Sequence, residues 1–129
     1  MYGSLVVFLG AGLGGVLRHG LNTTLPKMVG TTFPIATMVA NITGSLLMGL
    51  IVGYLAFKDG QMASQSVRLF LTTGLLGGYT TFSTFSLDFF FLMERGQHGL
   101  AALYVLVSVS LAFIGVFASV YNYLICTHR

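Results

Sequence analysis

The sequence GGYTTFSTF, residues 77–85, lies in the middle of an apolar run that is long enough to cross a lipid bilayer. Two glycines and a series of Thr and Ser side chains interrupt the helical pattern there. A membrane tolerates irregular backbone at that depth only where protein or a water-filled path supplies hydrogen-bond partners. Broken spans of this kind often form ion sites. The stretch therefore predicts a helix break near Gly77 to Thr80 and a function located beside it.

The composition is that of an integral membrane protein. Of the 129 residues, 55% are hydrophobic and only 7% are charged, whereas a soluble domain carries about 25% charged residues. Six Lys and Arg residues outnumber three acids, but they are scattered and form no basic stripe, which argues against nucleic-acid binding. Cys126 is the only cysteine, so an intrachain disulfide is impossible.

Four segments are long and apolar enough for transmembrane helices, each of which needs about 20 residues. They are residues 4–22, 33–57, 67–93 and 99–125. The first segment follows a start without Lys or Arg, so we interpret it as a span rather than a secretory signal. The connections at 23–32, 58–66 and 94–98 leave no room for an extramembrane domain. The sequence predicts an all-α protein with a single four-helix transmembrane domain.

The positive charges give no preferred orientation in the membrane. Four spans place Lys58, Arg68 and Arg129 on one side and Arg18, Lys27 and Arg95 on the other. Because orientation follows the Lys/Arg bias of short loops, this balance favours insertion in both directions. Oppositely oriented copies would then form an antiparallel, dual-topology homodimer. The alternative is that six charges are too few to carry this information.

Pairs of glycines four residues apart predict close helix crossings. They are Gly10/Gly14, Gly49/Gly53 and Gly74/Gly78. Small residues at this spacing let the backbones of membrane helices approach closely. With seventeen glycines in the chain, some such pairs also arise by chance.

Polar side chains repeat at helical spacing within two of the spans. Thr37, Asn41 and Ser45 share one face of the second span, and Tyr104 and Ser108 share a face of the fourth. A buried Asn needs partners, and its two N–H donors suit an anion. These residues are therefore candidates for a polar path. The alternative is interhelical hydrogen bonding, which we prefer for Ser45.

Phe82 and Phe85 lie three residues apart beside the predicted break, so a helix that resumes there presents them on one face. An aromatic ring has a negative face and a positive edge, so the ring edges favour a desolvated anion. The alternative is ordinary core packing, since the chain contains eleven Phe residues.

The distribution of acids excludes several activities. Spans one, two and four contain no Asp or Glu, while Asp88 and Glu94 lie late in the third span and after it. Proton-coupled transporters normally need an intramembrane carboxylate or His relay. The chain also has no nucleophile–base pair, clustered metal-ligand side chains or phosphate loop, so we do not expect an enzyme.

Three motifs give the chain a resemblance to a known family. They are GLGGVLR at 12–18, NITGS at 41–45 and GLLGGYTTFSTFS at 74–86. With these motifs the chain resembles the Fluc (CrcB) family of small fluoride channels over nearly its whole length. The resemblance implies an antiparallel homodimer in the bacterial inner membrane, with two passive pathways that export fluoride selectively and give fluoride resistance.

The resemblance also implies roles for individual residues. The aromatic pair lining the pores would be Phe82 and Phe85, the essential polar group Asn41, and the hydroxyl track Thr37, Tyr104 and Ser108. The backbone carbonyls of Gly77 and Thr80 would bind a structural sodium ion at the dimer centre, and Arg18 would lie near a wide vestibule. The chain departs from the family pattern at His19, Leu46 and Asp88, outside this set.

Two other classes remain as alternatives. A small dual-topology multidrug exporter has similar size and span number, but it depends on a carboxylate in its first helix, which is missing here. A non-transporting assembly subunit would account for the glycine pairs but not for the polar break or Asn41. DNA compaction is disfavoured by the lack of a soluble basic surface.

Overall fold

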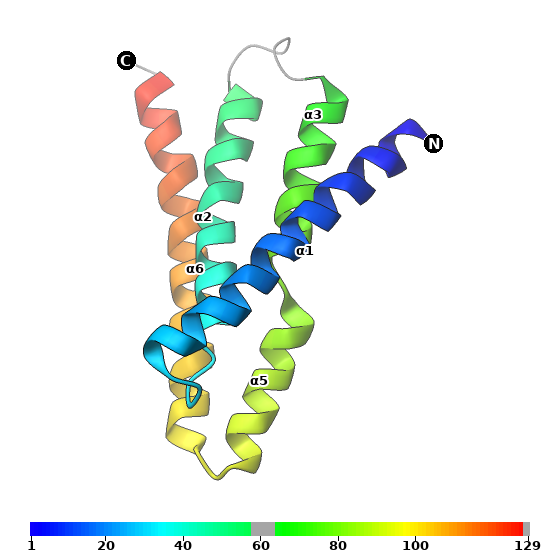
Figure 1. Cartoon of the computed structure of the whole chain (residues 1–129). Coiled ribbons are helices and arrows are strands. Elements are labelled where there is room, and N and C mark those ends of the chain that lie inside the picture. The colour runs from blue at the N-terminus through cyan, green and yellow to red at the C-terminus, as the bar shows by residue number, and fades with distance from the viewer. Residues whose placement is uncertain (58–63, 128–129) are drawn as a thin grey trace.

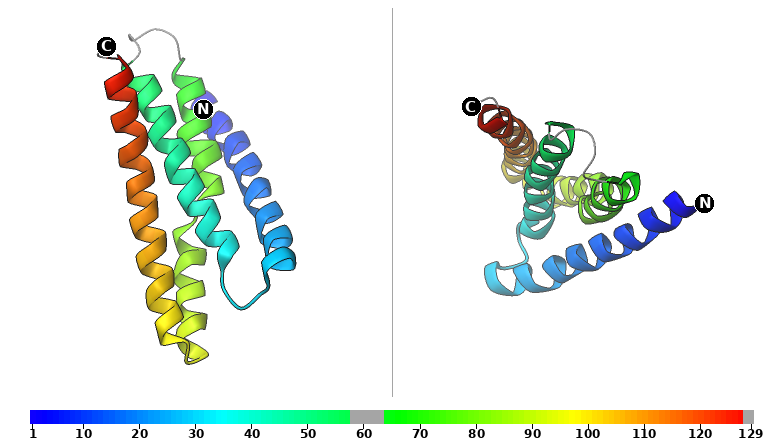
Figure 2. Two further views of the ribbon diagram at one scale, coloured as in Figure 1. Left: turned by 90° about the vertical axis from the view of Figure 1, so that its left-hand side faces the viewer. Right: turned by 90° about the horizontal axis from the view of Figure 1, so that it is seen from above.

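The structure, a computed structural model, describes residues 1–57 and 64–127, and all regular elements within them are helices. The elements are α1 (Tyr2–Val29), α2 (Ile35–Phe57), α3 (Gln65–Leu69), the π-helix η1 (Phe70–Leu76), α4 (Gly77–Tyr79), α5 (Phe82–Glu94) and α6 (His98–Thr127). Both described ends of the chain lie toward the same end of the molecule, and α1 crosses the other helices obliquely (Figures 1 and 2). The predicted charges Lys58 and Arg129 lie outside the described residues.

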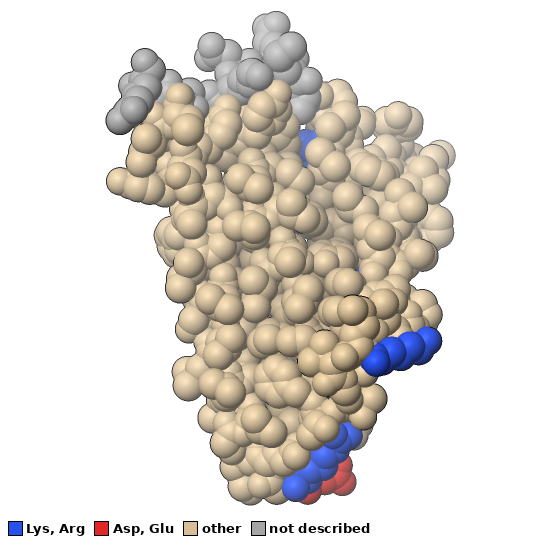
Figure 3. Space-filling view, turned by 60° about the vertical axis from the view of Figure 1, so that its left-hand side comes forward, with Lys and Arg blue, Asp and Glu red and all other residues tan. Residues whose placement is uncertain are grey.

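Within the described residues, three helices are long and apolar enough to cross a membrane. Their spanning parts are Tyr2–Val29, Ile35–Leu55 and His98–Cys126. The third predicted span, 67–93, is divided instead. Elements α3, η1 and α4 follow one another without a gap, and α5 begins after the break. The face in Figure 3 consists almost entirely of residues other than Lys, Arg, Asp and Glu, as contact with lipid requires.

The first connection is shorter than predicted, because α1 continues through Pro26 to Val29. The predicted loop at 23–32 is therefore wrong over its first seven residues. A proline removes one intrahelical N–H, and in the last turn of a long helix that loss affects a single hydrogen bond. The helix ends instead at Gly30, whose φ of 101° is accessible to glycine and whose N–H donates to the Pro26 oxygen at 2.9 Å.

Glycines make the crossing between α1 and the divided helix possible. A Cβ built on Gly10 would lie 2.9 Å from the Gly74 Cα, and one on Gly78 would lie 2.8 Å from the Ala11 Cα. A Cβ on Gly14 would meet the Leu75 oxygen. No side chain fits at these positions, so the two predicted glycine pairs, 10/14 and 74/78, are confirmed as a helix crossing.

The third predicted glycine pair lies between α2 and α6. A Cβ on Gly49 would approach the Val116 oxygen at 2.8 Å, and one on Gly53 would lie 3.2 Å from the Tyr123 Cβ. Both contacts confirm the predicted close approach. The opposite end of the bundle contains a buried cluster of Leu92, Ala101 and Tyr104, against which Phe33, Met38 and Phe85 pack.

The predicted helix break is confirmed, but threonines rather than glycines form it. Gly77 is helical, whereas Thr80 (φ −84°, ψ 157°) and Thr81 (φ −154°, ψ 126°) are extended. Thr81 is also the N-cap of α5, because its hydroxyl accepts from the Thr84 N–H at 3.2 Å. Thr is β-branched and tolerates extended backbone well, while Gly78 is needed for the contact with Ala11.

Candidate functional site at the helix break

The break is attached to α2 through the side chain of Asn41. Its Nδ2 donates to the Thr81 oxygen at 3.0 Å, and the Thr81 N–H donates to its Oδ1 at 2.8 Å. One amide therefore binds both backbone groups of Thr81, whose N–H has no helical partner because Thr81 is the N-cap of α5. An Asn amide carries a second N–H that these two bonds do not use.

The break leaves the backbone carbonyls of residues 77–80 without their helical donors. In a continuous α-helix the Thr81 N–H would bond to Gly77 O and the Thr84 N–H to Thr80 O. Here the Thr81 N–H donates to Asn41 and the Thr84 N–H to the Thr81 hydroxyl. The carbonyls of Gly77 and Thr80 are thus two of the four, at residues 77–80, that have no helical donor at the break. Unwound carbonyls at the C-terminal end of a half-helix suit a sodium ion, so the residues present fit such a ligand.

Arg18 reaches the break from α1. Its Nη1 donates to the Thr80 oxygen at a long distance of 3.4 Å, and its side chain is partly buried. The guanidinium thus contacts the Thr80 carbonyl, which is one of those without a helical donor. Arg18 brings a positive charge to this part of the membrane-spanning region.

The aromatic residues form a continuous series from the break into the core. The ring centroids of Phe82 and Phe85 are 5.9 Å apart, and those of Phe85 and Tyr104 are 5.0 Å apart. Phe33 meets Tyr104 edge to face at 5.7 Å. Phe82 lies at the exposed end of the series, with 79% of its surface accessible. The two Phe residues are therefore neighbours on one face of α5.

The hydroxyl groups predicted for the polar track lie beside these rings. Tyr104 is completely buried, and its hydroxyl donates to Oδ2 of Asp88 at 3.1 Å. The Thr37 side chain also interacts with the Tyr104 hydroxyl. Ser108, one turn further along α6, is 3% exposed, and its Oγ has no hydrogen-bond partner within the part of the chain that the structure describes. Such a group is costly unless something else binds it.

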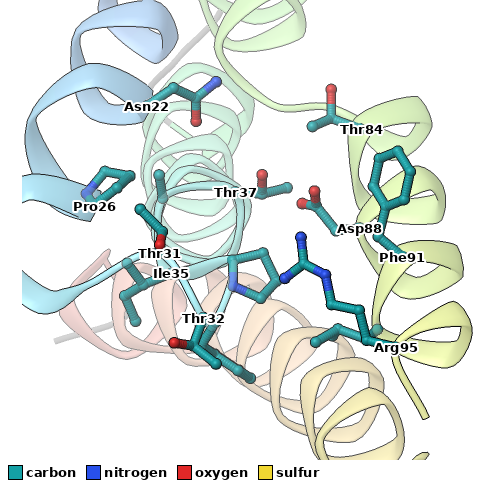
Figure 4. Close-up of a pocket in the computed structure, with 14 residues that line it drawn as sticks. Asn22, Pro26, Thr31, Thr32, Ile35, Thr37, Thr84, Asp88, Phe91 and Arg95 are labelled. Atoms are coloured by element: carbon teal, nitrogen blue, oxygen red, sulfur yellow. The ribbon is translucent and has the colours of Figure 1, made fainter. Parts of the chain in front are cut away.

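Two cavities lie along the polar face of α2. One, of about 280 Å³, is lined by Asn41, Ser45, Thr80, Thr81 and Phe82. The other, of about 270 Å³, includes Thr37, Thr84, Asp88 and Arg95 among its lining residues. In Figure 4 the Asp88 carboxylate and the Arg95 guanidinium reach into the same space opposite Thr37. Thr37 and Asn41 are one helical turn apart, so the cavities follow one another along α2.

The structure thus brings most of the predicted site residues together. Asn41, Phe82, Phe85, Thr37 and Tyr104 line the cavities or contact residues that do.

Sequence reasoning missed the pairing of Asp88 with Tyr104, although Asp88 follows Phe85 by three residues and shares its face of α5. It also missed the hydrogen bond between Thr43 and Tyr79. No signal in a single sequence announces that contact, because the two residues lie on different helices.

The fold and the site define a multi-pass membrane protein with polar groups gathered at a helix break. Residues 5–120 match the family described as CrcB-like protein, Camphor Resistance (CrcB). The chain belongs to this family.

Known proteins similar to this chain carry a common name. A protein of Rhodopseudomonas palustris (strain BisB5), named fluoride-specific ion channel FluC, is 63% identical over 114 residues, which cover 88% of this chain and 90% of the relative. Proteins with the same name from Methylobacterium nodulans and Beijerinckia indica are 58% and 59% identical. These alignments cover 92% and 91% of this chain and 94% and 92% of the two relatives.

Proposed function

We propose that the chain forms a fluoride-selective passive anion channel that exports cytoplasmic fluoride. The observation that carries the proposal is the series Phe82–Phe85–Tyr104 beside two cavities at the helix break, each of which is lined in part by polar side chains. The names of the relatives from Rhodopseudomonas, Methylobacterium and Beijerinckia support the choice of fluoride. The bacterial source of these relatives supports a location in the inner membrane.

Fluoride would pass from one cavity to the other along the polar face of α2. In the first cavity the unused N–H of Asn41 can donate to it. Between the cavities, the edges of the Phe82 and Phe85 rings favour a desolvated anion. Beyond them, the hydroxyls of Thr37 and Ser108 replace further water molecules. A narrow path of this kind selects an ion by replacing its hydration shell.

No energy source other than the ion gradient and the membrane voltage is needed. HF crosses membranes as a neutral acid and dissociates in the more alkaline cytoplasm, which traps fluoride. The inside-negative potential then drives the anion out through an open path, at about 2.3 kcal/mol per charge for 100 mV. This mechanism gives resistance to fluoride without proton coupling. The absence of an acid from α1 argues against the multidrug exporter.

We propose that two antiparallel copies complete the site. Phe82 has 79% of its surface accessible although it belongs to the aromatic series. A Cβ on Gly77 would meet only the Thr72 oxygen, at 3.7 Å, so the face of the break is uncovered in a single chain. A second copy placed there would bury Phe82 and bring two breaks together. The even charge distribution across the predicted membrane sides supports opposite orientations.

A sodium ion between the two breaks would bind carbonyls that have no helical donor. Gly77 O and Thr80 O of each copy would hold it. Bound there, it would supply positive charge to four carbonyl oxygens at the ends of two half-helices. Arg18 would contribute positive potential that attracts anions to the nearby vestibule.

The experiment that tests the function is efflux from liposomes. Purified protein is reconstituted with internal potassium fluoride, and a potassium ionophore is added while a fluoride electrode records release. Rapid release that is insensitive to a pH gradient, with negligible release of chloride from matched vesicles, is expected. Equal release of chloride would exclude selectivity, and no release of either ion would return the assembly-subunit alternative.

A further inference from the structure

Thr43 and Tyr79 form a second polar connection between α2 and the break, separate from that of Asn41. The two hydroxyl oxygens are 2.9 Å apart. The Thr43 hydroxyl donates to the Val39 oxygen at 2.7 Å, which uses its only proton. Tyr79 must therefore donate to Thr43. Both residues are partly buried, in a part of the chain that lies within the bilayer.

The position of Tyr79 is also fixed by packing. A Cβ on Gly44 would lie 3.2 Å from Cδ1 of the Tyr79 ring and would meet the Thr80 methyl group. The glycine therefore provides the space in which the ring passes over α2 to reach Thr43. On its other side the ring borders an apolar cavity lined by leucines of α1, α2, η1, including Leu17, Leu47 and Leu75.

Thr80 is consequently attached to α2 through both of its neighbours. Tyr79 is bound by Thr43, and Thr81 is bound by Asn41. The hydroxyl of Thr80 donates back to the Leu76 oxygen at 2.9 Å. The Thr80 carbonyl itself accepts from Arg18 of α1.

We infer that Tyr79 is a positioning residue for the cation site, because its hydrogen bond to Thr43 acts together with the Asn41 bond to Thr81 to fix the direction of the Thr80 carbonyl. Without the Thr43 acceptor, the Tyr79 hydroxyl would be unpaired in an apolar surrounding and the side chain would move to find another partner. The peptide group that carries the Thr80 oxygen would then be restrained only through the bond of the Thr81 N–H to Asn41, and its orientation would be less sharply defined. This inference rests on the proposed sodium site and adds two residues that the site needs but that do not touch the ion.

The test compares Tyr79→Phe and Thr43→Val, singly and combined, with Tyr121→Phe as a control that removes a hydroxyl from an exposed tyrosine of α6. Sodium is titrated against the thermal unfolding midpoint of each purified full-length dimer, and fluoride efflux is measured at saturating sodium. We expect the sodium concentration at half-maximal stabilisation to rise about tenfold in each single variant. Each copy of the dimer loses its Thr43–Tyr79 hydrogen bond, so two lost bonds affect the one ion that the copies share.

The double variant is expected to be no worse than either single one, and Thr43→Ser, which keeps the acceptor, to behave as the wild type. Efflux at saturating sodium stays within about twofold of wild type, since the pore residues are unchanged. An unchanged sodium midpoint in Tyr79→Phe and Thr43→Val would overturn the inference. A lower thermal unfolding midpoint at every sodium concentration, with an unchanged sodium concentration at half-maximal stabilisation, would overturn it too, because such a result shows only a structural role.

The outcomes also separate this inference from the channel function. If the wild type conducts fluoride but does not respond to sodium, the cation site and the role of Tyr79 both fail while the channel stands. If the wild type responds to sodium but conducts no fluoride, the channel proposal fails and the titration still decides the role of Tyr79.

Discussion

The two halves of α6 pack differently, and the difference separates a structural contact from a site. In the C-terminal half the Ser119 hydroxyl is 2.7 Å from the Gly115 oxygen and 3.1 Å from the Leu46 oxygen, and both are acceptors for it. In the N-terminal half Ser108 is equally buried but its hydroxyl has no partner among the described residues. Buried polar groups are normally paired. An unpaired one beside an aromatic series therefore points to a ligand.

The same contrast holds for the helices that α6 meets. Its C-terminal half packs closely on α2, where Gly49 meets the Val116 backbone and Gly53 meets the Tyr123 side chain. Its N-terminal half meets α5 through Tyr104, which stacks near Phe85 and binds Asp88. Tight glycine contacts give stability, while the polar and aromatic half retains space for an ion.

The largest effect is expected for Asn41→Leu. The Thr81 N–H and oxygen would both lose their partner inside the membrane, at a cost of about 2–4 kcal/mol in unfolding free energy. Fluoride efflux should be lost as well. The matched variant is Asn122→Leu, since Asn122 donates only to Ala118 of its own helix and is exposed. The unfolding free energy measured by denaturant should fall in the first variant and stay within about 0.5 kcal/mol of wild type in the second. Equal changes in the two variants would show that the Asn41–Thr81 hydrogen bonds do not stabilise the break.

A smaller but more specific effect is expected for Phe85→Ile. Removing the ring between Phe82 and Tyr104 should slow fluoride efflux by about a hundredfold, which corresponds to about 2.7 kcal/mol in the barrier. The elution volume of the purified protein should not change. Phe117→Ile, at an exposed position in the other half of α6, should conduct normally. Retained flux in both Phe82→Ile and Phe85→Ile would remove the aromatic pair from the pathway.

The glycine crossing offers a test of stability alone. Gly14→Ala would force a methyl group against the Leu75 oxygen, whereas Gly12→Ala meets nothing within 4 Å. Overpacking of this kind costs about 1–3 kcal/mol. Only the first variant should lower the thermal unfolding midpoint. An equal thermal unfolding midpoint in the two variants would show that α1 can move away from η1 without loss of stability.

The smallest effect concerns the two buried serines. Ser119→Ala removes a satisfied hydroxyl and should cost about 1 kcal/mol of stability with normal flux. Ser108→Ala removes an unpaired hydroxyl, so stability should stay the same or rise. Fluoride efflux should slow about threefold, which corresponds to losing about 0.7 kcal/mol of stabilisation of the passing ion. The opposite pattern would mean that Ser108 has a structural partner and no role in conduction.

The sequence was informative where a local signal has one physical cause. Glycine pairs at 10/14, 49/53 and 74/78 predicted two close helix approaches that the structure contains, because a missing Cβ matters where helices pack closely. The hydroxyl-rich motif predicted the break, because no continuous membrane helix needs such a segment. The four-residue spacing of Thr37 and Asn41 predicted a common face.

Other features depend on distant partners and could not be predicted from the sequence. The π-helix at Phe70–Leu76 shifts the hydrogen-bond register, and a search for a period of 3.6 residues does not detect it. Pro26 indicated a loop, but at the end of a helix it costs too little to stop α1. The hydrogen bonds of Asn41 to Thr81 and of Thr43 to Tyr79 join residues far apart in the sequence. They depend on how α2 packs beside the break.

The most direct test of fluoride selectivity is the reversal potential of the wild-type protein in a planar bilayer, with fluoride on one side and chloride on the other. A selective fluoride path predicts a reversal potential displaced far from zero toward the fluoride equilibrium potential, and no shift when the pH of one side is changed. A reversal potential near zero at equal concentrations would show that chloride passes equally well and would contradict the account.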